Sequence, residues 1–277
     1  KPYPREKARC SSIIYFRLSY CKIPRMRDFF FTFVFMKPTL EVIATQLRHV
    51  EMAQRSGAHR IELCSALSSD GLTPSYGFIQ SAIAQSVLPV MVMIRPREGD
   101  FRYSIEEIAC MQQDIAWAKE CGAAGIVIGI LDEHENVPVH ILKTWVQAAY
   151  PMEVTFHRAF DVCSDPFQAL EDIIAAGCTR ILTSGQEKQC TDGKALILQL
   201  QEKAGDRIVI MAGSGIHSNT LSLILDPNIR EYHMSGHQAG TPENVQEKMF
   251  GAQPSLNVTE IQQVARMLSE YEVNEWS

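Results

Sequence analysis

Residues 153–184 read EVTFHRAFDVCSDPFQALEDIIAAGCTRILTS and contain a complete strand–helix–strand unit. The two ends of this stretch, 153–158 and 179–184, are short and rich in β-branched and aromatic residues, as strands are. Between them, Asp165-Pro166 places a side-chain acceptor before a proline, an arrangement typical of the first turn of a helix. Gly177 then follows the helical run, where a left-handed residue often ends a helix. A helix between two strands predicts parallel strands joined by a crossover.

The same unit recurs along the chain from about residue 36 onward. We expect eight strands of five to seven residues each, at 40–44, 59–64, 89–95, 124–130, 153–158, 179–184, 207–212 and 229–235. The helices are expected between and after them, at 46–56, 75–86, 104–120, 138–149, 165–176, 191–204, 217–225 and 259–272. Eight such units in roughly 240 residues are typical of a (β/α)8 barrel. A doubly wound open sheet would usually carry a glycine-rich nucleotide loop after its first strand, where this chain has Ala44-Thr45-Gln46. We therefore predict an α/β fold, a single-domain (β/α)8 TIM barrel over residues 36–277.

Residues 1–35 have a different character. Their charged residues are mostly basic, and a short aromatic run, Phe29 to Phe35, precedes Met36. The apolar run is short for a signal peptide, and no small-residue cleavage site follows it. We therefore interpret Met36 as the natural start and residues 1–35 as a non-native or disordered extension. The alternative is a genuine targeting or membrane-surface arm.

Composition restricts the classes of function. The chain has 277 residues and a net charge of −6, and it shows no basic stripe, so we expect no nucleic-acid partner. It contains no uninterrupted run of about 18 apolar residues, so we expect no membrane span. None of the eight cysteines forms a CxxC pair, which argues against zinc-ribbon and thioredoxin-like sites. Reduced thiols in a cytoplasmic protein are the simplest interpretation.

Polar residues recur inside the expected strands. Alternate residues of a barrel strand face the interior, and because positions 40, 42 and 44 are apolar, Glu41 should point inward. The same rule directs further polar side chains into the barrel interior: Glu62, Cys64, Arg95, His157 and His233. Several of them lie near carboxyl ends of strands, where barrels build their sites. A ligand or reaction site is one interpretation, and a structural network pairing Glu41 and Glu62 with Arg60 and Arg95 is the other.

The loops after these strands favour a site for a small anion. Arg95 and Arg97 suit recognition of an anionic molecule, and the glycines of later loops can expose backbone N–H groups to phosphate. His157 has the chemistry of an acid or base, which the nearby carboxylate of Asp161 could orient, with Glu62 as a partner carboxylate. We predict catalytic roles for Glu62, His157 and Asp161. The predicted ligand-binding residues are Glu41, Arg95, Arg97, Arg158, Ser184, Gly213, Gly215 and His233.

Several runs of the chain resemble the CutC family, in the order expected for that family. They are RIELCS at 60–65, MIRPR at 93–97, GDF at 99–101, VTFHRAFD at 154–161, LTSG at 182–185, GSGI at 213–216 and EYH at 231–233. The resemblance covers about residues 36–250. It implies a TIM barrel, a cytoplasmic location, a role in copper homeostasis and a homo-oligomer, with a dimer favoured over a tetramer.

The resemblance raises the question of copper. Cu(I) prefers thiolate and thioether ligands, and Cys64 should point inward near Met91 and Met93. Some family members carry a second cysteine where this chain has Ile43, which weakens the case for a two-thiolate site. Cys163 is the alternative second thiolate. Cys64 and the methionines can equally be core residues. Three functions stay open: copper homeostasis with Cu(I) bound, an enzyme acting on a small anionic substrate, phosphorylated or not, and an oligomeric interaction protein.

Overall fold

Eight short strands form the centre of the structure, a computed structural model that describes residues 38–238, 240, 245–250 and 254–274. The strands are β1 Thr39–Ala44, β2 Arg60–Leu63, β3 Val90–Met93, β4 Gly125–Ile128, β5 Glu153–Phe156, β6 Arg180–Thr183, β7 Val209–Gly213 and β8 Glu231–Met234. Each pairs in parallel with the next, and β8 pairs in parallel with β1. The closed ring confirms the predicted barrel. The prediction for residues 1–35 lies outside the described residues.

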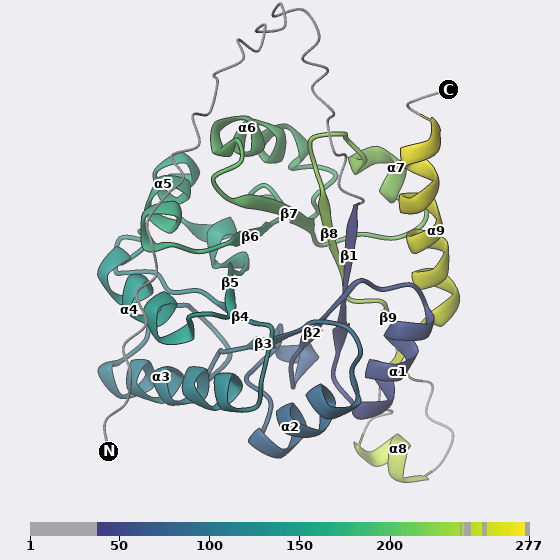
Figure 1. Cartoon of the computed structure of the whole chain (residues 1–277), viewed down its shortest axis with the longest axis horizontal. Coiled ribbons are helices and arrows are strands. Elements are labelled where there is room, and N and C mark those ends of the chain that lie inside the picture. The colour runs from purple at the N-terminus through teal and green to yellow at the C-terminus, as the bar shows by residue number, and fades with distance from the viewer. Residues whose placement is uncertain (1–37, 239, 241–244, 251–253, 275–277) are drawn as a thin grey trace, which may run out of the picture. The chain divides into compact units, whose positions relative to one another are not determined.

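Helices surround this ring, as Figure 1 shows. They are α1 Leu47–Arg55, α2 Tyr76–Gln85, α3 Ile105–Glu120, α4 Val139–Ala149, α5 Pro166–Ala176, α6 Lys194–Ala204, α7 Leu221–Ile224 and α9 Val258–Asn274. Ser104 and Glu107 form a capping box at the start of α3, and Asp165 caps α5, as predicted, by accepting hydrogen bonds from two backbone N–H groups. Gly177 ends α5 with a φ of 93°, in the left-handed region that favours glycine. No helix in the described part of the chain is long and apolar enough to cross a bilayer.

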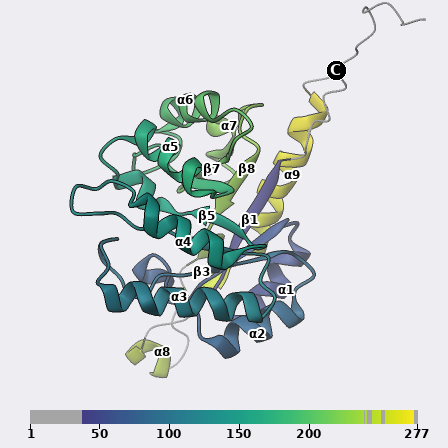
Figure 2. The ribbon, with the colours of Figure 1, turned by 60° about the vertical axis from the view of Figure 1, so that its left-hand side comes forward.

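The strands divide their side chains between two environments. On β1, Leu40 and Val42 are fully buried in the apolar layer between the strands and the helices. Glu41 lies between them in sequence and points the other way, toward Arg60 and His233. Figure 2 shows from another side how the helices enclose the sheet, with α9 running near β1. Burying each large apolar side chain stabilises the fold by roughly 1.5–3 kcal/mol, so this outer layer holds the ring together.

The structure departs from the sequence prediction mainly after β7. The helix expected at 217–225 is only the short α7, because the Thr220 hydroxyl bonds to the backbone N–H of His217 and the carbonyl of Gly215. Such side-chain bonds compete with helix formation. Beyond β8 the chain adds three unpredicted elements: β9 His237–Gln238, α8 Val245–Phe250 and β10 Ser255–Leu256. Strands β9 and β10 pair with each other in antiparallel fashion, outside the barrel.

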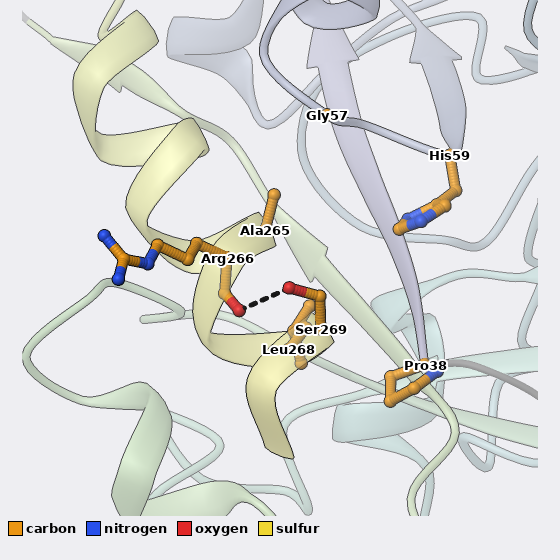
Figure 3. Close-up of a pocket in the computed structure, with 7 residues that line it drawn as sticks. All are labelled: Pro38, Gly57, His59, Ala265, Arg266, Leu268 and Ser269. Carbon is orange, nitrogen blue, oxygen red and sulfur yellow. Dashed lines mark hydrogen bonds between the residues drawn. The ribbon is translucent and has the colours of Figure 1, made fainter. Parts of the chain in front are cut away.

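A hollow of about 350 Å³ lies at the amino ends of β1 and β2, where α9 packs against them (Figure 3). His59 and Pro38 form one wall and residues of α9 the other, with the Ser269 hydroxyl bonded to the carbonyl of Arg266. The Arg266 side chain is 77% exposed and paired with Glu270. A solvated ion pair beside packed side chains does not by itself indicate a ligand. Barrel sites are built at the opposite end, where the carboxyl ends of the strands lie.

Candidate functional site

A cavity of about 520 Å³ opens at the carboxyl ends of the barrel strands. Seven predicted site residues line it: Glu62, Arg95, His157, Arg158, Asp161, Gly215 and His233. The other five predicted residues lie outside its lining: Glu41, Cys64, Arg97, Ser184 and Gly213. The structure thus brings groups from β2 and β8, and from the loops after β3, β5 and β7, to one opening.

A network of buried ion pairs closes the barrel on the amino side of this cavity. Glu41 accepts a hydrogen bond from Arg60 Nε at 2.5 Å, and its other oxygen lies 2.8 Å from His233 Nδ1. Arg60 also donates to Glu231, which in turn accepts from Arg180. Burial alone would raise the pKa of Glu41, but Arg60 and the bond to His233 hold that pKa well below its usual value. Glu41 is therefore an ionised carboxylate with partners at both oxygens. This agrees with the prediction that Glu41 belongs to a structural network of ion pairs.

Glu62 lies between this network and the cavity, without the arginine partner that the network interpretation gave it. It is 2% exposed, and its Oε2 atom has no hydrogen-bond partner among the described residues. Burial raises the pKa of Glu62 to about 7, with His233 opposing the rise and the charge of Glu41 adding to it. A carboxyl group that titrates near neutral pH can both accept and return a proton under physiological conditions.

His157 is held as a neutral imidazole. The backbone N–H of Ala159 donates to His157 Nδ1 at 3.1 Å, so Nδ1 is the acceptor and the proton of the neutral ring lies on Nε2. Burial and the nearby charge of Arg95 lower the pKa of His157 to about 3. The ring packs against Phe101, with centroids 5.0 Å apart. Its Nε2 has no partner in the part of the chain that the structure describes, which leaves a buried N–H donor unused.

Asp161 does not orient His157, contrary to the expectation from the sequence. Its carboxylate accepts hydrogen bonds from the Thr183 hydroxyl at 2.5 Å and from the Ser184 backbone N–H at 3.0 Å. It also accepts from Arg158 Nε at 2.7 Å. The orientation of the imidazole comes from a backbone N–H instead, because the short helical turn Arg158–Val162 begins directly after His157. Asp161, Ser184 and Arg158 form a separate polar group at the rim.

Arg95 and Arg97 leave the same loop in different directions. Arg95 is 4% exposed and donates to the backbone carbonyls of Ser69 and Gly99, while its Nε atom has no partner among the described residues. None of the ion pairs found in the described residues includes Arg95. Arg97 instead pairs at the surface with Asp100 and Glu107, and it does not reach the cavity. The predicted pair of anion-binding arginines is thus reduced to one buried guanidinium.

The glycines at the end of β7 and in the loop after it have different environments. A Cβ atom at Gly213, the last residue of β7, would lie 2.5 Å from Leu182 Cδ1, the end of a flexible side chain that would have to shift. Gly215 lines the cavity directly. The sequence did not single out Asp70 and His217, which also line the cavity, because inward–outward alternation identifies residues in strands and not in loops.

Two groups of side chains have the donor types of metal ligands. Cys64 packs with Met91 and Met93 in a small buried apolar cluster, and burial raises the pKa of its thiol well above the usual value. Ligand atoms of Glu41, Glu62 and His233 all lie within 4.8 Å of one another. Both oxygens of Glu41 already have partners, and carboxylates with imidazole are not the soft donors that Cu(I) prefers. Of the two groups, only the sulfur cluster matches Cu(I) in donor type.

Comparisons with known proteins by sequence and by structure point to the same family. A profile of the CutC family matches residues 38–238. A family protein CutC of Pasteurella multocida is 48% identical over 198 residues, which cover 71% of this chain and 81% of that protein. Another from Photobacterium profundum is 44% identical, covering 75% of this chain and 85% of that protein.

Solved structures agree with this. The crystal structure of CutC from Streptococcus agalactiae, a protein whose name refers to copper homeostasis, has a TM-score of 0.67 and 31% identity. The match covers 71% of this chain and 97% of that protein. KGPDC from Streptococcus mutans has a TM-score of 0.56 at 9% identity, which reports a shared barrel fold and nothing about function.

Proposed function

The chain belongs to the CutC family, and on that premise we propose that its barrel mouth binds a small anionic organic molecule and acts on it as an enzyme. The cavity of about 520 Å³ is of the size that small-molecule sites have. It lies at the carboxyl ends of the strands, where barrel enzymes build their active sites. Its lining combines apolar side chains with a few converging polar groups, the composition expected of such a site.

The observation that carries this proposal is the unpaired charge of Arg95. A guanidinium buried to this degree usually has a carboxylate partner, because removing a charge from water is costly. Backbone carbonyls hold the terminal nitrogens of Arg95, but they supply no opposite charge. The Nε–H group is left without an acceptor. An anionic ligand in the cavity would supply both the charge and the acceptor.

Binding measurements with matched arginine variants test the proposal. We would titrate the full chain with inorganic phosphate, dihydroxyacetone phosphate, pyruvate and levulinate by calorimetry and ligand-observed NMR. A hydrogen bond to a charged group contributes about 1.5–3 kcal/mol, so Arg95→Gln should weaken binding by roughly 10-fold to 100-fold. Arg97→Gln is the control, because Arg97 belongs to the same loop but already has carboxylate partners. Equal losses in both variants, or no binding of any compound, would contradict the proposal.

Copper is a second candidate, supported by the sulfur cluster and by the name of the Streptococcus agalactiae relative. Cu(I) would be held by Cys64, Met91 and Met93, whose donor types suit a soft cation. The raised pKa of the Cys64 thiol works against this, because the metal must displace a proton to bind the thiolate. The proposal includes a cytoplasmic location, where thiols stay reduced.

A titration against a competing chelator tests the copper candidate. Reduced protein should bind Cu(I) stoichiometrically, and Cys64→Ser should abolish this binding. Cys178→Ser is the matched control, because Cys178 is also a buried thiol but packs in the outer core. Binding that survives in Cys64→Ser would remove this cluster from consideration.

A further inference from the structure

We propose that Glu62 and His157 form a proton-transfer pair for carbon acids: Glu62 moves a proton at the carbon next to a carbonyl group, and His157 donates a hydrogen bond to the carbonyl oxygen. The inference rests on the anion site proposed above and deepens it. The ligand class becomes a small aldehyde or ketone that also carries a phosphate or carboxylate group for Arg95. The roles differ from those expected from the sequence, where the histidine was the acid or base.

The role of His157 follows from the hydrogen bond at its other nitrogen. Because Nδ1 accepts from the Ala159 N–H, the neutral ring must present an N–H at Nε2. That atom is buried and has no acceptor among the described residues, although His157 lines the cavity. A neutral donor held in a fixed direction can stabilise the negative charge that develops on a carbonyl oxygen. It has no free nitrogen lone pair in this tautomer with which to act as a base.

The role of Glu62 follows from its buried oxygen. Oε2 has no donor among the described residues, and Glu62 lines the same cavity as His157. The charged and titratable groups that act on it are Glu41 of β1, Arg60 of its own strand and His233 of β8. Arg60 already binds Glu41 and Glu231, so it does not neutralise Glu62 directly. Glu62 therefore lines the cavity with a carboxyl oxygen that no donor of the described residues occupies, as a group that takes a proton from a bound molecule requires.

The proposed step needs only the substrate and the Glu62 carboxylate as reactants, and no oxidant or reductant takes part. The Glu62 carboxylate takes a proton from the carbon next to the carbonyl group, breaking a C–H bond. The two electrons of that bond form a C=C bond, and the carbonyl π electrons move to the oxygen, giving an enolate. His157 Nε2–H donates a hydrogen bond to this oxygen. If the proton on Glu62 exchanges with solvent before a proton is returned to the same carbon, the result is isotope exchange. Where that carbon carries a hydroxyl group, the hydroxyl proton can move to the carbonyl oxygen and Glu62 can return its proton to the former carbonyl carbon, which gives isomerisation.

Solvent deuterium exchange tests this step directly. The full chain is incubated in D2O with dihydroxyacetone phosphate, pyruvate and levulinate, and loss of the C–H signal is followed by proton NMR. General-base catalysis contributes about 10²–10⁴-fold, and one oxyanion donor about 10²–10³-fold. Catalysed exchange should therefore fall at least about 100-fold in Glu62→Gln and in His157→Leu. The controls are Glu133→Gln and His134→Gln, which change exposed side chains of one loop.

Further readouts separate chemistry from folding and from binding. Glu62→Asp keeps the carboxyl group and should retain part of the exchange, with a rate that rises with pH as the group ionises. Nitrogen-15 NMR of His157 should show a proton on Nε2 at pH 7. Exchange that survives in Glu62→Gln, or a proton on Nδ1, overturns the inference. A compound that binds without exchanging overturns it while leaving the anion site intact, whereas failure of every compound to bind removes the anion site itself.

Discussion

Replacing Glu62 by glutamine should make the protein less sensitive to alkaline pH. In the folded protein the pKa of this carboxyl group is raised to about 7, against 4.5 in an unperturbed glutamate. Between these two values, the folded state keeps the proton while the unfolded state releases it. Unfolding then releases a proton, so the free energy of unfolding falls as pH rises.

The magnitude follows from the difference between the two pKa values. Each pKa unit corresponds to about 1.36 kcal/mol, so the raised pKa of Glu62 corresponds to roughly 3 kcal/mol. This stability is fully present below pH 4.5 and is lost as pH rises through about 7. Glu62 is 2% exposed, so screening by solvent reduces the figure little.

Urea unfolding of the wild type and Glu62→Gln, measured from pH 4.5 to pH 8.5, gives the comparison. The difference in the free energy of unfolding between the two proteins should change by roughly 3 kcal/mol across this range, in favour of the variant at high pH. A constant offset carries no information, because an amide also changes the local hydrogen bonding. Glu133→Gln, at an exposed glutamate, should show no such trend. A flat difference for Glu62→Gln, or a trend of opposite sign, would refute the reasoning.

Three more perturbations test other parts of the structure. The pKa of His157 is lowered to about 3, so the stability that its neutral ring contributes is present above pH 6.5 and is lost as pH falls. In urea titrations, the free energy of unfolding of the wild type should therefore fall by about 2 kcal/mol between pH 7 and pH 5, relative to His157→Gln. Arg60→Met leaves Glu41 buried with its main partner removed and should cost about 3–5 kcal/mol by the same assay, and a loss below 1 kcal/mol would contradict the assigned network. Gly125→Ala would place a Cβ atom 2.7 Å from a backbone oxygen and should cost about 1–3 kcal/mol, whereas Gly77→Ala, in open space on α2, should be neutral or stabilising in thermal unfolding.

The fold and the inward direction of the polar strand residues were predictable from the sequence. Alternation along a strand has a fixed period of two, so the apolar residues around Glu41 were enough to indicate which way it points. The same argument applied to Glu62, and both directions are confirmed, because Glu41 bonds to Arg60 and His233 and Glu62 lines the cavity. The periodicity of apolar residues and the residues that cap helices involve only neighbouring positions of the chain, so both can be read directly from the sequence.

The pairing of these groups was not predictable in the same way. Arg95 and Arg97 are two residues apart on one loop, yet one is buried without a carboxylate and the other is paired at the surface. Likewise, the sequence suggested Asp161 as the partner of His157, whereas a backbone N–H orients the ring. Which group each charged or polar side chain pairs with depends on the path that the backbone takes after each strand ends. The protonation of Glu62 depends on neighbours from other strands, which no local pattern contains.

The ion pairs on the amino side of the cavity have a consequence for how molecules reach Glu62. Arg60, Arg180 and Glu231 fill the ring below it, so a ligand must enter and leave by the same opening. A bound molecule therefore stands between Glu62 and bulk water for as long as it stays. A hydrogen isotope removed from that molecule would then reach solvent through the occupied opening only, so part of the label should be returned before it is replaced.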